Sequence, residues 1–286
     1  MEASIGSFLK DLYALPEGEA FKQCIQCGVC SALCPNALSM EYPPRAMIAW
    51  LRAGIIDRVL DSNTAWLCSS CYSCRAHCPS GVSMIPLMTE IRGRAVEQGR
   101  IPKPVQTVLT NMMRNYNPWG EPEERRSRWA EGLRVKDLSK GDSGEVLLFV
   151  CCTPAYDARN QNVARSTAAV LEKVGVDFAV LGNRERCCGD SILRMGEKGL
   201  FEMLVEENGN AFEDYGVQRI VTISPHCFNT IKKDYPAFGR NYPVEHYTQL
   251  VSDLVDGGSI RFSKRLEKVV TYQDPCFLGR YNGVYD

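Results

Sequence analysis

The chain has 286 residues, of which 45% are hydrophobic and 23% charged, an ordinary composition for a globular protein of one to three domains. Its 33 Lys and Arg residues balance 34 Asp and Glu residues, and the net charge of −1 argues against non-specific binding of nucleic acid. No apolar run reaches the roughly 18 residues of a membrane span, and residues 1–10 lack the pattern of a secretory signal. These features predict a cytoplasmic protein that reaches the inner face of the membrane only through partners.

Cysteine is the exception to this ordinary composition. The chain has 14 cysteines, and eight of them lie between Cys24 and Cys78. Structural disulfides are rare in a reducing compartment, so clustered cysteines there favour metal binding.

Two cysteine runs form an internal repeat. Residues 24–35 read CIQCGVCSALCP and residues 68–79 read CSSCYSCRAHCP, so each run is C-x2-C-x2-C-x3-C-P. Apolar residues at helical spacing predict a helix over 45–60 and another over 84–95. Since no strand pattern accompanies the repeat, residues 1–98 should form a helical module.

The spacing within each run is typical of proteins that hold two [4Fe–4S] clusters, in which the Cys before Pro ligates the other cluster. We therefore expect crossed ligation. The first cluster should use Cys24, Cys27, Cys30 and Cys78, and the second Cys68, Cys71, Cys74 and Cys34. Zinc also takes four thiolates and is the alternative, although zinc sites usually pair two C-x2-C segments.

The pattern changes after residue 98. Residues 99–144 are rich in Pro and charge and predict a linker with one helix over 104–114, its mixed charges at 121–128 forming a solvated face. From residue 145 strands and helices alternate, which favours an α/β layer with a mostly parallel sheet. Strands are expected at 146–150, 178–181, 219–223 and 268–272. Helices are expected at 159–174, 198–215, 228–234 and 246–255.

The remaining six cysteines follow the predicted strands. They are Cys151, Cys152, Cys187, Cys188, Cys227 and Cys276. Open α/β sheets bind ligands beyond the carboxyl ends of their strands, and the adjacent Cys187 and Cys188 are poorly placed for a structural disulfide. A redox or metal site is therefore expected at Cys152, Cys187, Cys188 and Cys227. The alternative is that these cysteines are small buried hydrophobic residues.

These motifs carry a family resemblance. The paired runs resemble the α-helical ferredoxin module of succinate dehydrogenase iron–sulfur subunits and heterodisulfide reductases. Residues 149–157, 181–189 and 224–230 resemble the cysteine-rich CCG domain, and residues 274–283 resemble the start of a second CCG repeat. The order of the two modules is similar to that of the D-type subunit of heterodisulfide reductase.

The resemblance implies an α + α/β fold class with four parts: a helical ferredoxin module at 1–98, a linker at 99–144, a CCG domain at 145–267 and an incomplete second CCG repeat at 268–286. It also implies a third, non-cubane [4Fe–4S] cluster on Cys152, Cys187, Cys188 and Cys227. Ser224 stands where the family has a fifth cysteine, and Cys151 and His226 are possible substitutes for that ligand.

The resemblance implies an electron-transfer subunit of an oxidoreductase. Its two cubanes would pass electrons to the CCG site, where Cys152, Cys187, Cys188 and Cys227 would reduce or oxidise a disulfide or thiol. The alternative is a relay without a substrate of its own, which links a flavoprotein dehydrogenase of the glycolate, lactate or glycerol-3-phosphate type to a membrane quinone pool. Expected partners are a flavoprotein, a hydrogenase or a membrane cytochrome, because the chain lacks Walker and G-x-G-x-x-G motifs.

Overall fold

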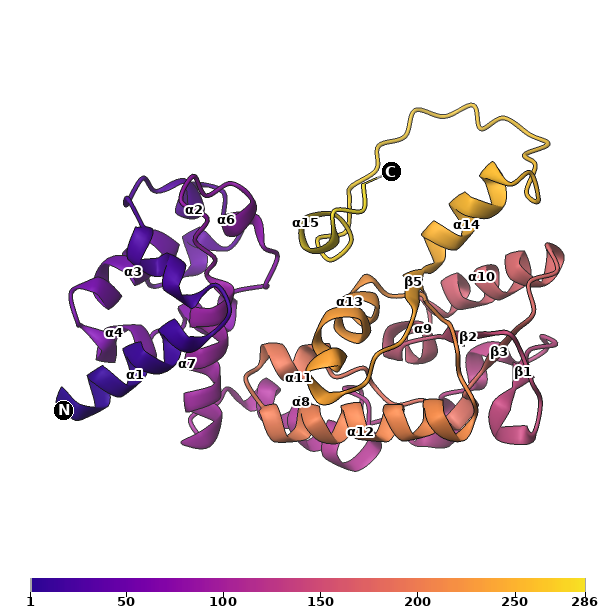
Figure 1. The fold of residues 1–286 in the computed structure, drawn as a ribbon, viewed down its shortest axis with the longest axis horizontal. Coiled ribbons are helices and arrows are strands. Elements are labelled where there is room, and N and C mark those ends of the chain that lie inside the picture. Colours follow the sequence, from indigo (N-terminus) through magenta and orange to yellow (C-terminus); the bar gives the residue numbers. More distant parts are fainter. Residues whose placement is uncertain (1, 286) are drawn as a thin grey trace. The chain divides into compact units, whose positions relative to one another are not determined.

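The computed structural model describes residues 2–285 of the chain, which divides into two compact units (Figure 1). The helical unit takes in residues up to Ile101, together with Ser191–Lys198 and the segment that starts at Cys276. The α/β unit comprises Pro102–Asp190 and Gly199–Pro275. Much of the stretch 99–144 that we expected to be a linker is therefore part of the α/β unit.

The helical unit consists of short helices around one apolar core. They are α1 (Glu2–Ala14), α2 (Val29–Ala32), α3 (Pro44–Arg52), α4 (Ile56–Leu60), α5 (Thr64–Leu67), α6 (Ser73–Ala76), α7 (Ile85–Glu97) and α15 (Gly279–Asn282). The helix expected over 45–60 is split into α3 and α4 because Gly54 takes a positive φ of 73°. The helix expected over 84–95 is confirmed as α7.

The core of this unit holds the cysteine loops in place. Apolar side chains of α3 and α7, among them Met47, Leu51, Leu87 and Ile91, are buried together. Four of the repeat cysteines pack against this core: Cys24, Cys68, Cys74 and Cys78. Burial of the apolar faces of α3 and α7 therefore positions both loops.

The α/β unit contains a five-stranded, all-parallel sheet of order β1-β3-β2-β4-β5. Its strands are β1 (Lys136–Asp137), β2 (Val146–Phe149), β3 (Phe178–Val180), β4 (Ile220–Thr222) and β5 (Val244–His246). Its helices are α8 (Lys103–Asn115), α9 (Cys152–Tyr156), α10 (Gln161–Lys173), α12 (Lys198–Asp214), α13 (Pro225–Asn229) and α14 (Tyr247–Asp256). Helix α11 (Asp190–Arg194) starts in this unit, and its residues from Ser191 on belong to the helical unit. The expected α + α/β class is confirmed.

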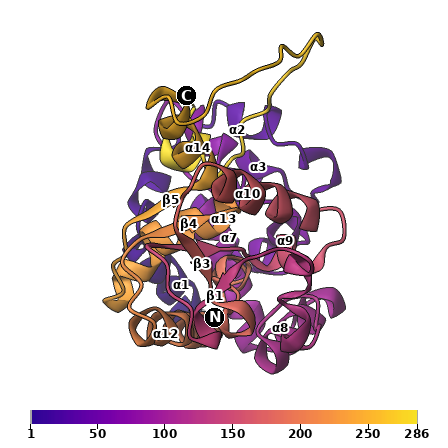
Figure 2. The same ribbon diagram turned by 90° about the vertical axis from the view of Figure 1, so that its right-hand side faces the viewer.

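Helices cover both faces of the sheet, with α10 and α12 on opposite sides (Figures 1 and 2). Successive residues of β2 point to alternate faces. Leu148 is buried with residues of α10 and α14, whereas Phe149 contacts Phe212 of α12 with ring centroids 6.0 Å apart. The sheet is thus buried on both sides, as parallel sheets generally are.

The prediction of a strand over residues 268–272 is wrong. Residues 268–272 form no strand, and Val269 and Val270 are exposed. Alternating apolar residues become a strand only where a neighbouring strand takes up their backbone hydrogen bonds, and this segment pairs with no strand of the described sheet.

Within residues 2–285, no helix combines the length and the apolar character that crossing a bilayer requires.

Candidate metal centres

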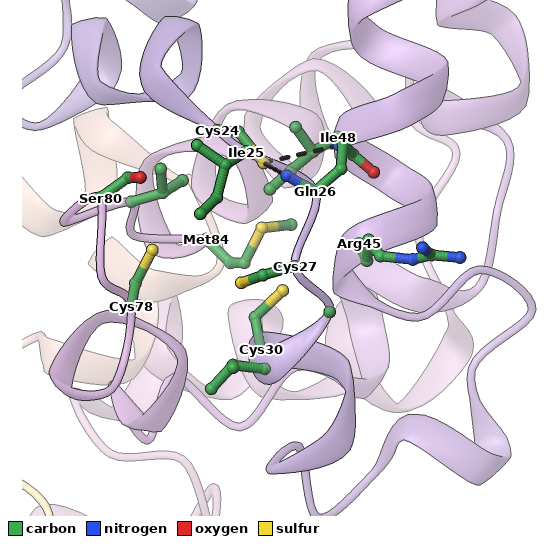
Figure 3. Close-up of a pocket in the computed structure, with 13 residues that line it drawn as sticks. Cys24, Ile25, Gln26, Cys27, Cys30, Arg45, Ile48, Cys78, Ser80 and Met84 are labelled. Carbon is green, nitrogen blue, oxygen red and sulfur yellow. Dashed lines mark hydrogen bonds between the residues drawn. The ribbon is translucent and has the colours of Figure 1, made fainter.

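The first cysteine group lies around a cavity of about 390 Å³ in the helical unit. Cys24, Cys27 and Cys30 line it from the first run, and Cys78 lines it from the second. Figure 3 shows the sulfur atoms of these four cysteines directed toward a common space. The Cys24 sulfur accepts hydrogen bonds from the backbone nitrogen and the side-chain amide of Gln26, at 3.4 and 3.5 Å.

The second cysteine group lies around a cavity of about 380 Å³. Cys68, Cys71 and Cys74 line it from the second run, and Cys34 lines it from the first. Met84 lines both cavities, so the two groups share this side chain in their walls. Each cavity therefore combines three cysteines of one run with the last cysteine of the other.

The two loops share one backbone shape. The second and fourth residues after the first cysteine have positive φ in both loops, namely Gln26 and Gly28 in one and Ser70 and Tyr72 in the other. Left-handed conformations cost a non-glycine residue energy and are maintained where the surroundings require them. The repeat in sequence is thus also a repeat in conformation.

The donor set of both cavities fits an iron–sulfur cluster. Burial raises the pKa of Cys30 and Cys68 and raises that of Cys74 to about 12, so these thiols need a cation beside them to ionise. A [4Fe–4S] cluster takes four cysteines, each on a separate iron atom. Four thiols around each cavity match that requirement.

Cys276 lies in the helical unit, beside the second loop. Arg280 of α15 donates from Nη1 to the Cys276 sulfur at 3.2 Å and to the carbonyl oxygen of Cys71 at 3.0 Å. The Tyr281 hydroxyl donates to the carbonyl oxygen of Ser70 at 2.8 Å, and its ring stacks on Tyr72. The segment from Cys276 therefore covers the loop of the second cysteine group.

Five cysteines of the α/β unit form a third group, which we call the CCG thiols: Cys151, Cys152, Cys187, Cys188 and Cys227. Each is buried, with 2 to 7% of its surface exposed. Cys151 and Cys152 follow β2, Cys187 and Cys188 lie in the loop after β3, and Cys227 lies in α13 after β4. They lie beyond the carboxyl ends of three neighbouring parallel strands, where such sheets bind ligands.

The CCG thiols form a continuous chain of side-chain contacts. A hydrogen bond with the Cys187 thiol, together with burial, raises the pKa of Cys152. Hydrogen bonds with Cys187 and Cys227 lower the pKa of Cys188 to about 7. Burial, and then the thiols of Cys151 and Cys188, raise the pKa of Cys227. The structure thus brings together the four cysteines that the sequence singled out and adds Cys151 to them.

The three candidates for a fifth ligand differ in setting. Cys151 has φ 74° and ψ 164°, a conformation that favours glycine, and its thiol donates to the carbonyl oxygen of Phe149 at 3.3 Å. The Ser224 hydroxyl accepts from the backbone nitrogen of His226 at 3.3 Å and caps α13. The His226 ring is half exposed and lies 2.8 Å from Asp190, so it stands at the rim of the group.

Arg126 is a site residue that the sequence did not reveal. It belongs to the mixed-charge run 121–128, which we expected to be a solvated face, yet its side chain is only 4% exposed. Its Nη1 and Nη2 atoms lie 3.6 and 3.7 Å from the Cys152 sulfur, and Nη2 lies 2.5 Å from Glu185. No periodicity in the run distinguishes this arginine from its exposed neighbour Arg125.

Two family models match these sites. A 4Fe-4S dicluster domain matches residues 20–82, and the CCG cysteine-rich domain matches residues 146–232. The chain thus contains a dicluster domain followed by a CCG domain. The dicluster match supports the two [4Fe–4S] clusters expected from the cysteine repeat.

Curated relatives are similar along most of this CCG-domain chain. EtfAB:quinone oxidoreductase of Syntrophomonas wolfei is 41% identical over 242 residues, which cover 82% of the chain and 34% of the relative. FadF of Bacillus subtilis, named a probable iron-sulfur-binding oxidoreductase, is 37% identical over 258 residues, 87% of the chain and 35% of the relative. The D-type subunit of the dihydromethanophenazine:CoB–CoM heterodisulfide reductase of Methanosarcina barkeri is 30% identical over 226 residues, 77% of the chain and 54% of the relative. The chain thus spans about a third to a half of the length of these relatives.

Proposed function

We propose that this chain relays electrons from a flavoprotein dehydrogenase toward a membrane quinone pool. The observation that carries the proposal is the pair of cysteine-lined cavities with Met84 lining both, because clusters in cavities that share a lining side chain are close enough to exchange electrons. The first relative named above is an EtfAB:quinone oxidoreductase, which supports the same pair of partners. Each bound cluster supplies a one-electron carrier, and the chain's own residues hold and insulate it.

The proposed ligands are crossed between the two runs. Cys24, Cys27 and Cys30 hold the first cluster with Cys78, and Cys68, Cys71 and Cys74 hold the second with Cys34. The lining of the two cavities supports this assignment. Crossed ligation also ties the two loops together, so that neither cluster assembles properly without both runs.

A third cluster is proposed at the CCG thiols. Four ligands are Cys152, Cys187, Cys188 and Cys227, and Cys151 is the fifth thiol in contact with them. A buried nitrogen, Nε of Arg126, lacks a hydrogen-bond partner among the described residues. Five soft sulfur ligands beside a buried guanidinium with one unpaired N–H group suit an anionic iron–sulfur cluster.

Disulfide reduction at the CCG thiols is the second candidate. Its support is the similarity to the D-type heterodisulfide reductase subunit of Methanosarcina barkeri. The burial of all five thiols favours the relay, because a disulfide must reach the sulfur or iron that cleaves it. The direct partners we propose are therefore redox proteins: a flavoprotein on one side and a quinone-linked membrane protein on the other, at the cytoplasmic face of the membrane.

The relay is tested with the chain reconstituted with iron and sulfide under anaerobic conditions. A reduced flavoprotein of the EtfAB kind should bleach the cluster absorbance near about 400 nm, and a water-soluble quinone should restore it. Dithionite serves as the control for reducible clusters. Bleaching by dithionite but not by the flavoprotein would overturn the relay, and turnover of a disulfide with a reduced viologen would favour the second candidate.

A further inference from the structure

Arg126 is a buried cation directed at one of the CCG thiols. Its side chain is 4% exposed, and two of its nitrogen atoms lie 3.6 and 3.7 Å from the Cys152 sulfur. Its third nitrogen, Nε, is buried and lacks a hydrogen-bond partner among the described residues. In a site that excludes water, a charge at this distance acts strongly on the sulfur.

Glu185 fixes the position of this guanidinium. Its carboxylate lies 2.5 Å from Arg126 Nη2 and accepts from the backbone nitrogens of Val150 and Cys151 at 2.8 and 2.9 Å. An arginine side chain is always protonated in proteins, so Arg126 carries a positive charge. Glu185 anchors this charge to the loop that carries Cys151 and Cys152.

The cubane cysteines have a different electrostatic setting. The donors to the Cys24 sulfur are the neutral amides of Gln26. Three guanidinium groups near these loops donate to backbone carbonyl oxygens: Arg52 to Cys24, Arg92 to Cys68 and Arg280 to Cys71. Arg45 also lines the first cavity. At the CCG thiols the guanidinium donates to the sulfur itself, which is the atom that would bind iron.

We propose that Arg126, acting through Cys152, raises the reduction potential of the cluster at the CCG thiols and makes that site the end point of electron flow within the chain. The inference rests on the proposed function, since it requires a cluster at this site. Hydrogen bonds to ligand sulfur and nearby positive charge stabilise the more negative, reduced state of an iron–sulfur cluster. One electron leaves the cubane and one enters the CCG cluster, with no bond made and no proton transferred.

The test is a redox titration of the reconstituted full chain, followed by the EPR signals of the CCG cluster and the cubanes. Arg126→Gln should lower the ratio of reduced to oxidised CCG cluster about tenfold at a fixed potential, which is about 59 mV for one electron. Arg126→Lys keeps the charge and should give a smaller shift of the same sign. Glu185→Gln removes the compensating negative charge and should shift the ratio in the opposite direction.

Arg165→Gln is the matched control. Arg165 donates from Nη1 to the carbonyl oxygens of Trp129 and Glu131 at 2.6 and 2.9 Å, so it anchors the same region of the chain without reaching the CCG thiols. It should leave the CCG potential unchanged, and all variants should leave the cubane potentials unchanged.

Three results would overturn the inference. If Arg126→Gln and Arg126→Lys leave the CCG potential unchanged, Arg126 does not set it, although the relay stands. If the Arg126 and Glu185 variants shift the potential in the same direction, the pair acts by holding the loop rather than by charge. If the wild-type chain has no third signal, the proposed CCG cluster fails together with the inference.

Discussion

The backbone conformation of Cys151 favours glycine, yet its side chain is one of the CCG thiols. It has φ 74°, where glycine is favoured, yet it is buried with its thiol against Cys227. Strain of this kind costs about 1–3 kcal/mol and persists where function requires it. The sequence indicated Cys151 only as a possible substitute for a fifth ligand, and the structure places its thiol in contact with Cys227.

We therefore predict that Cys151→Gly lowers the iron bound at the CCG thiols while the chain stays at least as stable, because glycine relieves the strain. Iron analysis and urea unfolding measure the two effects. Ser224→Ala is the comparison: it should keep the iron and cost about 1 kcal/mol of stability through the lost cap of α13. The opposite pattern, with iron lost from Ser224→Ala and kept in Cys151→Gly, would make Ser224 the fifth ligand.

His246 is a buried neutral base. Its Nδ1 accepts from the backbone nitrogen of Thr248 at the start of α14, and its Nε2 lies 2.9 Å from the carbonyl oxygen of Ile223. Burial lowers its pKa from 6.5 to about 4. Between these values the unfolded chain binds a proton that the folded chain does not, so stability falls as pH falls.

We predict a loss of up to about 1.4 kcal/mol per pH unit from His246 between pH 6.5 and 4. In His246→Asn, the free energy of unfolding should depend less on pH across this window, because the titrating group is gone. Urea unfolding at several pH values measures the slope. Equal slopes for His246→Asn and the wild type would assign the acid sensitivity to other groups.

At the scale of elements, the two cysteine loops depend on each other. Cys78 follows α6 in the second run but lines the cavity of the first group. We predict that Cys78→Ala damages the cluster of Cys24, Cys27 and Cys30. Its EPR spectrum should match that of Cys27→Ala, and a spectrum that matches Cys71→Ala instead would disprove crossed ligation.

The helices and central strands of this fold could be predicted because their signals are local. Apolar residues at helical spacing predicted α7, α10 and α12, and short runs of apolar residues predicted β2, β3 and β4. Strand β5 and the two-residue β1 were missed, since such short edge strands carry little pattern of their own. The expected strand at 268–272 failed for the reverse reason: its pattern is present but its partner strand is not.

The same contrast between local signals and contacts made by the fold applies to the two cysteine loops and to the CCG thiols. Gly28 could be predicted as a tight turn, but the matching positive φ of Tyr72 follows only from the second loop copying the first. Cysteine spacing identified the first two groups, and the position of cysteines after predicted strands identified the third. Arg126 and Cys151 could not be predicted in their roles, since burial and contact arise from the fold around them.

At the scale of the whole molecule, three cysteine groups in two units hold three clusters in our proposal. The two cavities of the helical unit account for two of them, and the CCG thiols account for the third. Each group depends on residues distant in sequence. Iron content therefore reports on the folding of both units.

The iron and sulfide content of the anaerobically reconstituted chain tests the three-cluster proposal most directly. We predict about twelve iron and about twelve sulfide per chain, falling to about eight of each when Cys187 and Cys188 are both replaced by Ser. About eight of each in the unaltered chain would contradict a cluster at the CCG thiols, and zinc without sulfide would contradict all three.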